Sequence, residues 1–388
     1  MATHPKVSDL RSFRKDCPNH AAILRGMRIA SAAVRAYYLF DIADTIDLRS
    51  LRTIQGEGLA PADIPLKPHA SNSYLQFPTP PLAARLANAV FGDLVCSVRV
   101  KFFDYGVISL RFSSAVSGSW DELEDVANRM RRSDEISAYA SQAVERICAE
   151  LGPALDDPHP ALMEDYFIVE VERFEQPIEA EKLLHDQSEA LAHILLGETA
   201  SLAQSEVEEA LRTRFSYLSD DLTIVQWDTA FVYDRRESSE AIGDILEFAN
   251  SQLIELRTYD ALLDRELDSI YALAPGGRSR SLFGRREADV AANVRYLIVD
   301  ILELIDRSSN ALKVVGDAYY ARIYRAAASR LGLADWQRQI DSKLASVGDM
   351  YRFLIDQSHG QRASFLEWVV IVLIAIEVVI GVVTLVKH

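Results

Sequence analysis

Hydrophobic and polar residues alternate most regularly along residues 95–112, VCSVRVKFFDYGVISLRF. Apolar side chains at every second position are separated by polar ones such as Arg99, Lys101 and Arg111, and a turn at 104–106 divides the segment. A period of two is typical of a strand with one buried face, so the pattern predicts a β-hairpin at 95–112. Three further segments rich in aromatic and β-branched residues are strand candidates: RAYYLFDIA, YFIVEVERF and LTIVQWDTAFVY.

Helical periodicity begins between these strands and takes over further along the chain. Apolar positions at helical spacing within residues 120–151 place helices among the strands, which predicts a mixed α/β domain of the α+β class over residues 1–235. From Leu246 to Ala274, apolar residues recur at alternating spacings of three and four. That heptad pattern, followed by two more helical segments, predicts a long antiparallel coiled-coil stalk over residues 236–364.

Asp260 occupies a seam position in the apolar stripe of the predicted stalk. Polar residues at such positions usually fix the register or the number of helices. A bound cation, or a buried partner such as Arg257 from a neighbouring helix, is the alternative role.

The C-terminal run from Trp368 to Val386 is apolar except for Glu377, and its length is close to the roughly 20 residues that cross a bilayer. We therefore expect a transmembrane anchor at 365–388, with Glu367 and Trp368 at the headgroup level. Glu377 shares a helix face with two smaller residues. This face predicts packing between copies of the chain; a tolerated protonated glutamate and an ion relay are the alternatives. The residues of this face are Glu377, Gly381 and Thr384.

An arginine-rich loop at 275–287 joins the first two predicted stalk helices. If the helices alternate in direction, this loop lies at the same membrane surface as the anchor, where arginines bind phosphates and apolar side chains enter the interface. A solvated turn is the alternative. The candidate interface residues are Arg278, Arg280, Leu282, Phe283, Arg285 and Arg286.

Composition narrows the function classes. The net charge of −16 over 388 residues argues against a general nucleic-acid binder, although a local basic patch could still bind one, and we expect no direct sequence-specific nucleic-acid binding. Three isolated cysteines suit a reducing compartment. The sequence contains no phosphate-loop, serine-hydrolase, HExxH or CxxC motif, so no catalytic residue, metal ligand or cofactor is assigned.

Without an apolar leader at the N-terminus, the expected location is a bacterial inner membrane with the body in the cytoplasm, or alternatively the mitochondrial inner membrane with the body in the matrix.

Three segments, LSDDLTIVQWDTAFVYD, DILEFANSQLIELRTYDALLDREL and RASFLEWVVIVLIAIEVVIG, together resemble the required-for-meiotic-nuclear-division family, which includes the yeast Rmd and Sif proteins. The resemblance implies an α/β body, a helical stalk and a C-terminal membrane helix, and a role in supporting translation near an inner membrane. It implies no catalytic residue. The positions that carry the resemblance are Trp227, Asp228, Asn250, Glu255, Arg257, Asp260, Asp264, Glu367, Trp368 and Glu377.

These observations favour a non-enzymatic scaffold anchored in a lipid membrane. It would self-associate through its stalk and anchor, and hold a cytoplasmic protein or a ribosomal partner at the inner membrane. Two alternatives remain open. One is an ion-channel or transport subunit of the CorA type, although the sequence has one apolar span and no Gly-Met-Asn tripeptide. The other is an enzyme whose site lies in the α/β domain.

Overall fold

The computed structural model divides the chain into two compact units, Met1–Thr258 with Asp306–Ala334 and Tyr259–Ile305 with Asp335–His388. The first unit holds the β-sheet. The residues that the structure describes are 27–51, 53–54, 64–65, 67–68, 75, 77–273 and 317–349.

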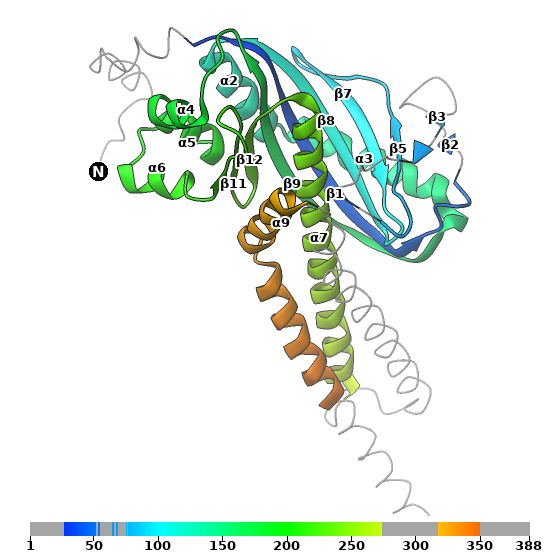
Figure 1. The fold of residues 1–388 in the computed structure, drawn as a ribbon. Helices are drawn as coiled ribbons and strands as arrows, with labels where there is room; N and C mark the ends of the chain where they lie inside the picture. Colours follow the sequence, from blue (N-terminus) through cyan, green and yellow to red (C-terminus); the bar gives the residue numbers. More distant parts are fainter. Residues whose placement is uncertain are drawn as a thin grey trace, which may run out of the picture. The chain divides into compact units, whose positions relative to one another are not determined.

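A ten-stranded sheet forms the body of the first unit (Figure 1). Its long central strands pair antiparallel, and only β12 runs parallel to its neighbour β9. The order along the sheet is β10-β11-β12-β9-β1-β8-β7-β5-β4, and β6 also pairs with β7. The strands are β1 (Ile29–Ile46), β4 (Lys67–Pro68), β5 (Leu82–Arg85), β6 (Ala89–Phe91), β7 (Leu94–Phe102), β8 (Val107–Gly118), β9 (Leu155–Phe174), β10 (Arg214–Phe215), β11 (Leu222–Val225) and β12 (Thr229–Tyr233). A separate two-stranded sheet consists of β2 (Thr53–Ile54) and β3 (Ile64–Pro65).

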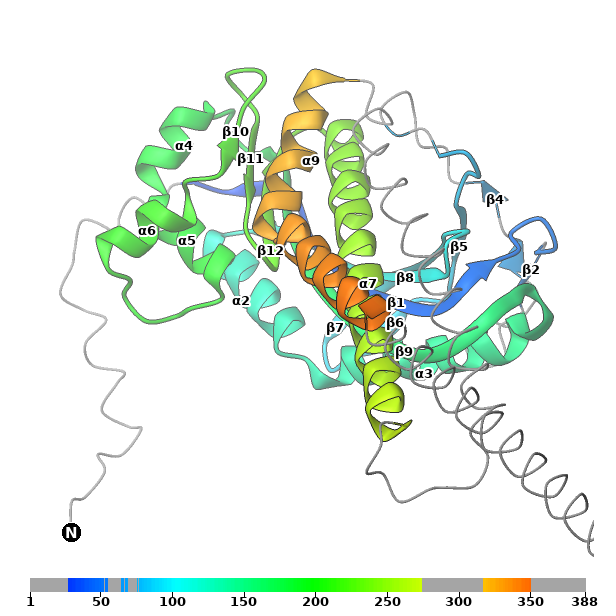
Figure 2. The same ribbon diagram turned by 90° about the horizontal axis from the view of Figure 1, so that it is seen from below.

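Helices cover both faces of the large sheet. Helices α2 and α3 lie on one face, and α9 and the part of α7 that belongs to the first unit, up to Thr258, lie on the other (Figures 1 and 2). Residues 333–349 are also helical. The helices are α2 (Trp120–Arg131), α3 (Asp134–Leu151), α4 (Ala180–Asp186), α5 (Ser188–Leu196), α6 (Gln204–Ala210), α7 (Arg236–Leu273) and α9 (Ala318–Arg330), with a 3-10 turn at Gly152–Ala154.

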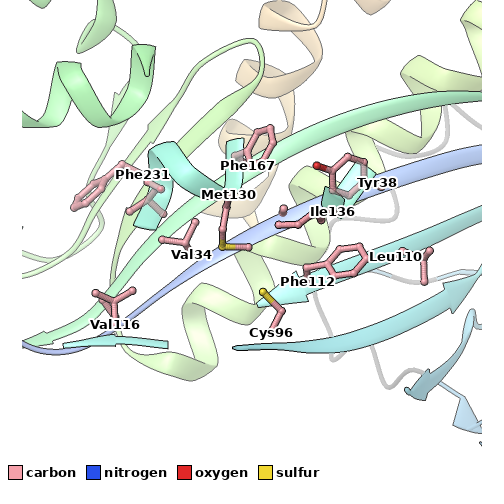
Figure 3. Close-up of a cluster of buried hydrophobic side chains, with 14 of the residues drawn as sticks. Val34, Tyr38, Cys96, Leu110, Phe112, Val116, Met130, Ile136, Phe167 and Phe231 are labelled. Atoms are coloured by element: carbon pink, nitrogen blue, oxygen red, sulfur yellow. The ribbon is translucent and has the colours of Figure 1, made fainter. Parts of the chain in front are cut away.

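The hydrophobic core lies between the sheet and helices α2 and α3 (Figure 3). Helix α2 starts at a capping box in which Ser119 and Glu122 satisfy each other's backbone N–H groups. It buries Leu123 and Met130 against the strands, because these positions share one face of a 3.6-residue helix. The strand residues that this core receives are the alternating apolar ones, such as Val34, Tyr38, Phe112 and Phe167.

Strands β7 and β8 form an antiparallel pair at the positions where the alternation predicts a hairpin. Gly106 in the connecting turn has a φ of +86°, and a Cβ atom there would lie 1.6 Å from the Ala43 carbonyl oxygen. Only glycine fits this close approach of two backbones. The turn is thereby held against the end of β1, where Ile42 N donates to Gly106 O over 3.1 Å.

The predicted fold class, an α+β domain with a coiled-coil stalk and a C-terminal transmembrane helix, is wrong as a whole. The structure shows a mixed α+β sheet domain with helices. The predicted anchor at 365–388 and the loop at 275–287 lie outside the described residues. Within the described residues, no helix is both long and apolar enough to cross a membrane. Helix α7, for example, carries Glu240, Asp244 and Glu247 on successive turns. The predicted single-pass location in a bacterial or mitochondrial inner membrane, which rested on the predicted transmembrane helix, is wrong as well.

Candidate functional site

A row of arginines crosses the sheet on the face opposite the hydrophobic core. The strand register places Arg111 of β8 directly beside Arg99 of β7, and Arg99 directly beside Arg85 of β5. On the other side of Arg111 the same row continues with Tyr37 of β1. Neighbouring strands are ~4.8 Å apart, and like charges directly opposite each other destabilise a sheet. Pairing between the strands alone therefore gives no reason for this row.

Glutamates form ion pairs with only some of the arginines on this face of the sheet. Glu240 of α7 accepts from Arg111 Nη1 over 2.9 Å and from Arg35 Nη2 over 3.2 Å. Arg35 Nη2 also lies 2.6 Å from a carboxylate oxygen of Glu170 on β9. By contrast, Arg85 and Arg99 make no ion pair with another described residue. Two guanidinium groups on adjacent strands thus lack an ion pair within the described part of the chain.

These side chains line a pocket with a volume of about 400 Å³, which we call the arginine pocket. Its floor is built from small residues of the three central strands, Ala33, Ser97, Ser113 and Ala115. Four arginines and three glutamates surround the floor, which gives the lining a formal charge of +1 (4 − 3) in a chain of net charge −16. The lining arginines are Arg35, Arg85, Arg99 and Arg111, and the glutamates are Glu170, Glu172 and Glu240.

Burial shapes the electrostatics of the pocket. The side chain of Arg35 is only 6% exposed, and its Nη1 atom is buried without a hydrogen-bond partner. Burial raises the pKa of Glu170, while the charge of Arg35 and the hydrogen bond from Ser239 work in the opposite direction. Burial also opposes ionisation of Glu240, but the charges of Arg111 and Arg35 outweigh it and lower the pKa of Glu240. The pocket therefore keeps a donor-rich surface with an unsatisfied buried donor.

The pKa of Arg99 is lowered from its ordinary value, first by burial and then by the neighbouring charge of Arg111. Both causes act against the positive charge that Arg99 carries at neutral pH. The charges of Glu240 and Asp244 act in the opposite direction without forming an ion pair with Arg99, and an anion placed beside Arg99 would add to their effect, because an opposite charge favours the charged form of a group.

Helix α7 is held on this sheet face by further charged contacts. Lys101 of β7 donates to Asp244 over 2.9 Å and also to Glu247. These carboxylates follow Glu240 at helical spacing, so one acidic stripe of α7 faces the basic stripe of the sheet. Gly243 lies between them, and a Cβ atom there would be 3.0 Å from the Tyr37 hydroxyl. The helix can approach the pocket wall closely because this position has no side chain.

The structure separates the residues of the predicted polar seam. Arg257 forms an ion pair with Glu164 of β9 in the first unit. In the second unit, Lys343 lies 2.7 Å from Asp260 and 2.6 Å from Asp264. Arg257 and Asp260 belong to the same helix, α7, rather than to neighbouring ones. The ammonium group of Lys343 thus lies beside Asp260, where a bound cation was one alternative predicted from the sequence.

The other predicted site residues do not line the arginine pocket. Trp227 is 66% exposed in the turn between β11 and β12, and Asp228 accepts from Thr229 Oγ1 over 3.1 Å. Asn250 is buried and donates to the Leu246 carbonyl over 2.9 Å, and Glu255 is buried as well. The remaining predicted residues lie outside the described part of the chain: Arg278, Arg280, Leu282, Phe283, Arg285, Arg286, Glu367, Trp368, Glu377, Gly381 and Thr384.

The sequence pattern alone predicted no functional role for the residues that line the arginine pocket. Arg99 and Arg111 occupy the polar positions of the predicted hairpin, where a solvent-facing side chain is the ordinary expectation. Two complementary patterns in the sequence could have indicated the pocket: a basic stripe on the strands and an acidic stripe at helical spacing after residue 236. Among the described residues, no group of three or more potential ligand side chains is placed to hold a metal ion.

Comparison with protein families matches residues 31–240 to the family described as "Uncharacterized protein MJ0711, N-terminal domain". A curated relative is the protein of that name from Methanocaldococcus jannaschii, which is 20% identical over 208 residues. The match covers 54% of this chain and 63% of the relative, so it spans less than two thirds of the relative's length. No solved structure matches the chain.

The matched family differs from the required-for-meiotic-nuclear-division family, and its curated relative is archaeal. The assignment that the resemblance suggested is therefore wrong. An apolar run and a heptad pattern suggested that resemblance, and both occur in many unrelated helices. The archaeal relative also lends no support to a bacterial or mitochondrial membrane location. The matched segment runs from Ser31 to Glu240 and contains every residue that lines the arginine pocket. Because the match covers more than half of the 388 residues, the chain belongs to the family of the MJ0711 N-terminal domain.

Proposed function

We propose that this protein is a binding module whose sheet domain holds a small anionic ligand in the arginine pocket. The observation that carries the proposal is the row of Arg111, Arg99 and Arg85 on adjacent strands, in which only Arg111 has an ion-pair partner among the described residues. Such a row costs folding energy through like-charge repulsion, and a bound anion would offset that cost.

The chemistry of the donors supports an oxyanion. A guanidinium group offers a planar fork that matches carboxylate and phosphate oxygens, and charge-assisted hydrogen bonds are stronger than neutral ones. The volume of about 400 Å³ lies within the ~300–1,000 Å³ typical of small-molecule sites. The excess positive charge of the lining would attract an anion to a protein that otherwise repels it.

A scaffold role, as the sequence favours, is compatible with ligand binding, and its protein partner and self-association stay predictions. An enzyme that acts on the same ligand is the competing candidate. Incubating the protein with a bound anion and analysing the products would separate binding from turnover, because a binding module returns the ligand unchanged.

The direct experiment is calorimetric titration of the full chain with inorganic phosphate, pyrophosphate and citrate at low salt. We expect at least one of these anions to bind, and Arg99→Gln to weaken binding by roughly 10- to 100-fold, since hydrogen bonds to charged groups contribute about 1.5–3 kcal/mol. Arg129→Gln is the matched control, because Arg129 lies on α2 and pairs with Asp125 over 3.4 Å. Failure of all three anions to bind, or equal loss in both variants, would refute the proposal.

A further inference from the structure

We infer that the ligand of the arginine pocket is a phosphate monoester of a hydroxyl-bearing molecule, either a sugar phosphate or a nucleoside monophosphate. This inference rests on the proposed anion binding and adds the ligand's chemical class. Its starting point is the uneven distribution of charge along the pocket: Arg85 on β5 and Arg99 on β7 have no ion-pair partner among the described residues, and Glu172 lies on β9 at the other end.

The arginine end suits a phosphate group. Arg85 and Arg99 are direct cross-strand neighbours, so their side chains start ~4.5–5.5 Å apart and can converge on one tetrahedral anion. Ser97 lies two residues from Arg99 on the same face of β7, and Ser113 stands opposite Ser97 on β8. Ser97 Oγ donates to the Ser113 carbonyl over 3.4 Å, so the Ser113 hydroxyl and the guanidinium groups are the hydrogen-bond donors at the phosphate position. A dianionic phosphate uses more of these donors than a single carboxylate can.

A bare phosphate ion would leave most of the pocket unfilled. A water molecule takes ~30 Å³ of liquid volume, so about 400 Å³ corresponds to room for about a dozen waters. The floor beyond the serines consists of Ala33 and Ala115, with Val95 beside them. Small apolar side chains at that place leave space for the organic body of the ligand, and they offer it no charged partner.

The far end of the pocket offers hydrogen-bond acceptors. Glu172 of β9 lines it and accepts from Ser31 Oγ over 2.9 Å. Only one Glu172 oxygen is used in that bond, and an ionised carboxylate has two oxygens that accept. Glu170 lines the same end, but its carboxylate already accepts from Ser239 Oγ and lies 2.6 Å from Arg35 Nη2, which leaves Glu172 as the acceptor for a ligand. Along β1, Ala33 lies between Ser31, the partner of Glu172, and Tyr37 of the arginine row, so one ligand must be longer than a phosphate ion to reach both ends.

Hydroxyl groups of a sugar or a ribose are neutral donors from which a carboxylate at that end can accept. Carboxylates hold ribose hydroxyls in this manner in dinucleotide-binding folds. A second phosphate or a carboxylate at that end would be repelled by Glu172. The pocket therefore selects a molecule with one anionic end and one hydroxyl-bearing end.

Calorimetry on the full chain can test this assignment with inorganic phosphate, ribose 5-phosphate, adenosine monophosphate, ribose and adenosine. We expect at least one phosphate monoester to bind ten or more times more tightly than inorganic phosphate, and the unphosphorylated molecules not to bind. The comparison of ribose 5-phosphate with adenosine monophosphate separates the two sources of the phosphate.

Two variants separate the ends of the pocket. Glu172→Ala is expected to reduce the advantage of the monoester over inorganic phosphate to less than threefold without weakening inorganic phosphate, whereas Arg99→Gln weakens both. Glu175→Gln is the control, because Glu175 is exposed and lies 3.6 Å from Arg28 outside the pocket. If inorganic phosphate binds as tightly as the monoesters, or if Glu172→Ala leaves their advantage intact, this inference is overturned while anion binding stands. If no phosphate compound or other anion binds, the proposed function fails with it.

Discussion

Lys101→Met should destabilise the protein strongly, because it removes the positive charge between two buried carboxylates. The side chain of Lys101 is 7% exposed, and those of Asp244 and Glu247 are 7% and 3% exposed. The two carboxylates outweigh the effect of burial and raise the pKa of Lys101, so the lysine is charged throughout the physiological range. Met has a similar length and no charge, so the substitution removes the ion pairs with little loss of volume.

The expected loss is about 3–5 kcal/mol in the free energy of unfolding, which is typical when one partner of a buried ion pair is removed. Urea unfolding at pH 7, followed by tryptophan fluorescence, measures it. The variant should regain stability as the pH falls, since carboxylates without a counter-charge bind protons more tightly in the folded state and stability then decreases as pH rises.

Two controls make the result specific. Lys182→Met removes an exposed pair with Asp186 and should change stability by less than ~0.5 kcal/mol. Adding Asp244→Asn and Glu247→Gln to Lys101→Met should restore much of the loss, because no buried charge is then left unpaired. A loss below 1 kcal/mol for Lys101→Met, or no recovery in the triple variant, would refute the reasoning that these charges attach α7 to the sheet.

Two further predictions concern single residues. Burial, followed by smaller contributions such as the charge of Asp221, raises the pKa of Asp234 to about 6, so the folded state holds a proton that the unfolded chain releases near pH 4. Stability should therefore fall as pH rises from about 4 to about 6, and a urea series over this range should show a smaller fall in Asp234→Asn; an identical pH profile would contradict the assignment. Gly106→Ala should cost well over 2 kcal/mol, because a backbone clash adds to the ~1–2 kcal/mol of the left-handed conformation. Gly92→Ala has the same kind of φ but open space around it, and should cost only about 1 kcal/mol; equal losses in the two urea curves would show that the clash is unimportant.

Local periodicity reveals the parts of this fold that depend on one buried face. The alternation from Cys96 to Phe112 coincides with β7 and β8, since every second side chain enters the core. The sequence did not reveal that β12 would run parallel to β9, or that β1 would lie between β8 and β9. Those pairings join residues far apart in the chain, and no local pattern encodes them.

The arginine pocket was not predictable from one strand at a time. Arg99, Arg111 and Arg85 each look like a solvent-facing residue on a half-buried strand, and only the register between three strands makes them a row. Glu240 and Asp244 likewise look like one polar side of an amphipathic helix. The structure instead places that side against the sheet, where it forms a second, charged layer with Arg111 and Lys101.

Apolar length and heptad spacing led the sequence analysis toward a membrane-anchored stalk. Both features describe composition along a helix, and they say nothing of which partner the helix meets. The family match, in contrast, covers residues 31–240 and therefore the sheet and its pocket. The part of the chain that carries the family relationship is also the part that carries the candidate site.

The central claim is that the arginine row is kept for a ligand rather than for the fold. The most direct measurement is urea unfolding of the wild-type protein and Arg99→Gln, each with and without a saturating phosphate compound. Without ligand, we expect the variant to be at least as stable as the wild type, because like-charge repulsion across the strands is relieved. With ligand at 100 times its dissociation constant, the wild type should gain about 2.7 kcal/mol and the variant far less. A variant that is less stable by more than 1 kcal/mol without ligand, or that gains as much as the wild type with it, would contradict the claim.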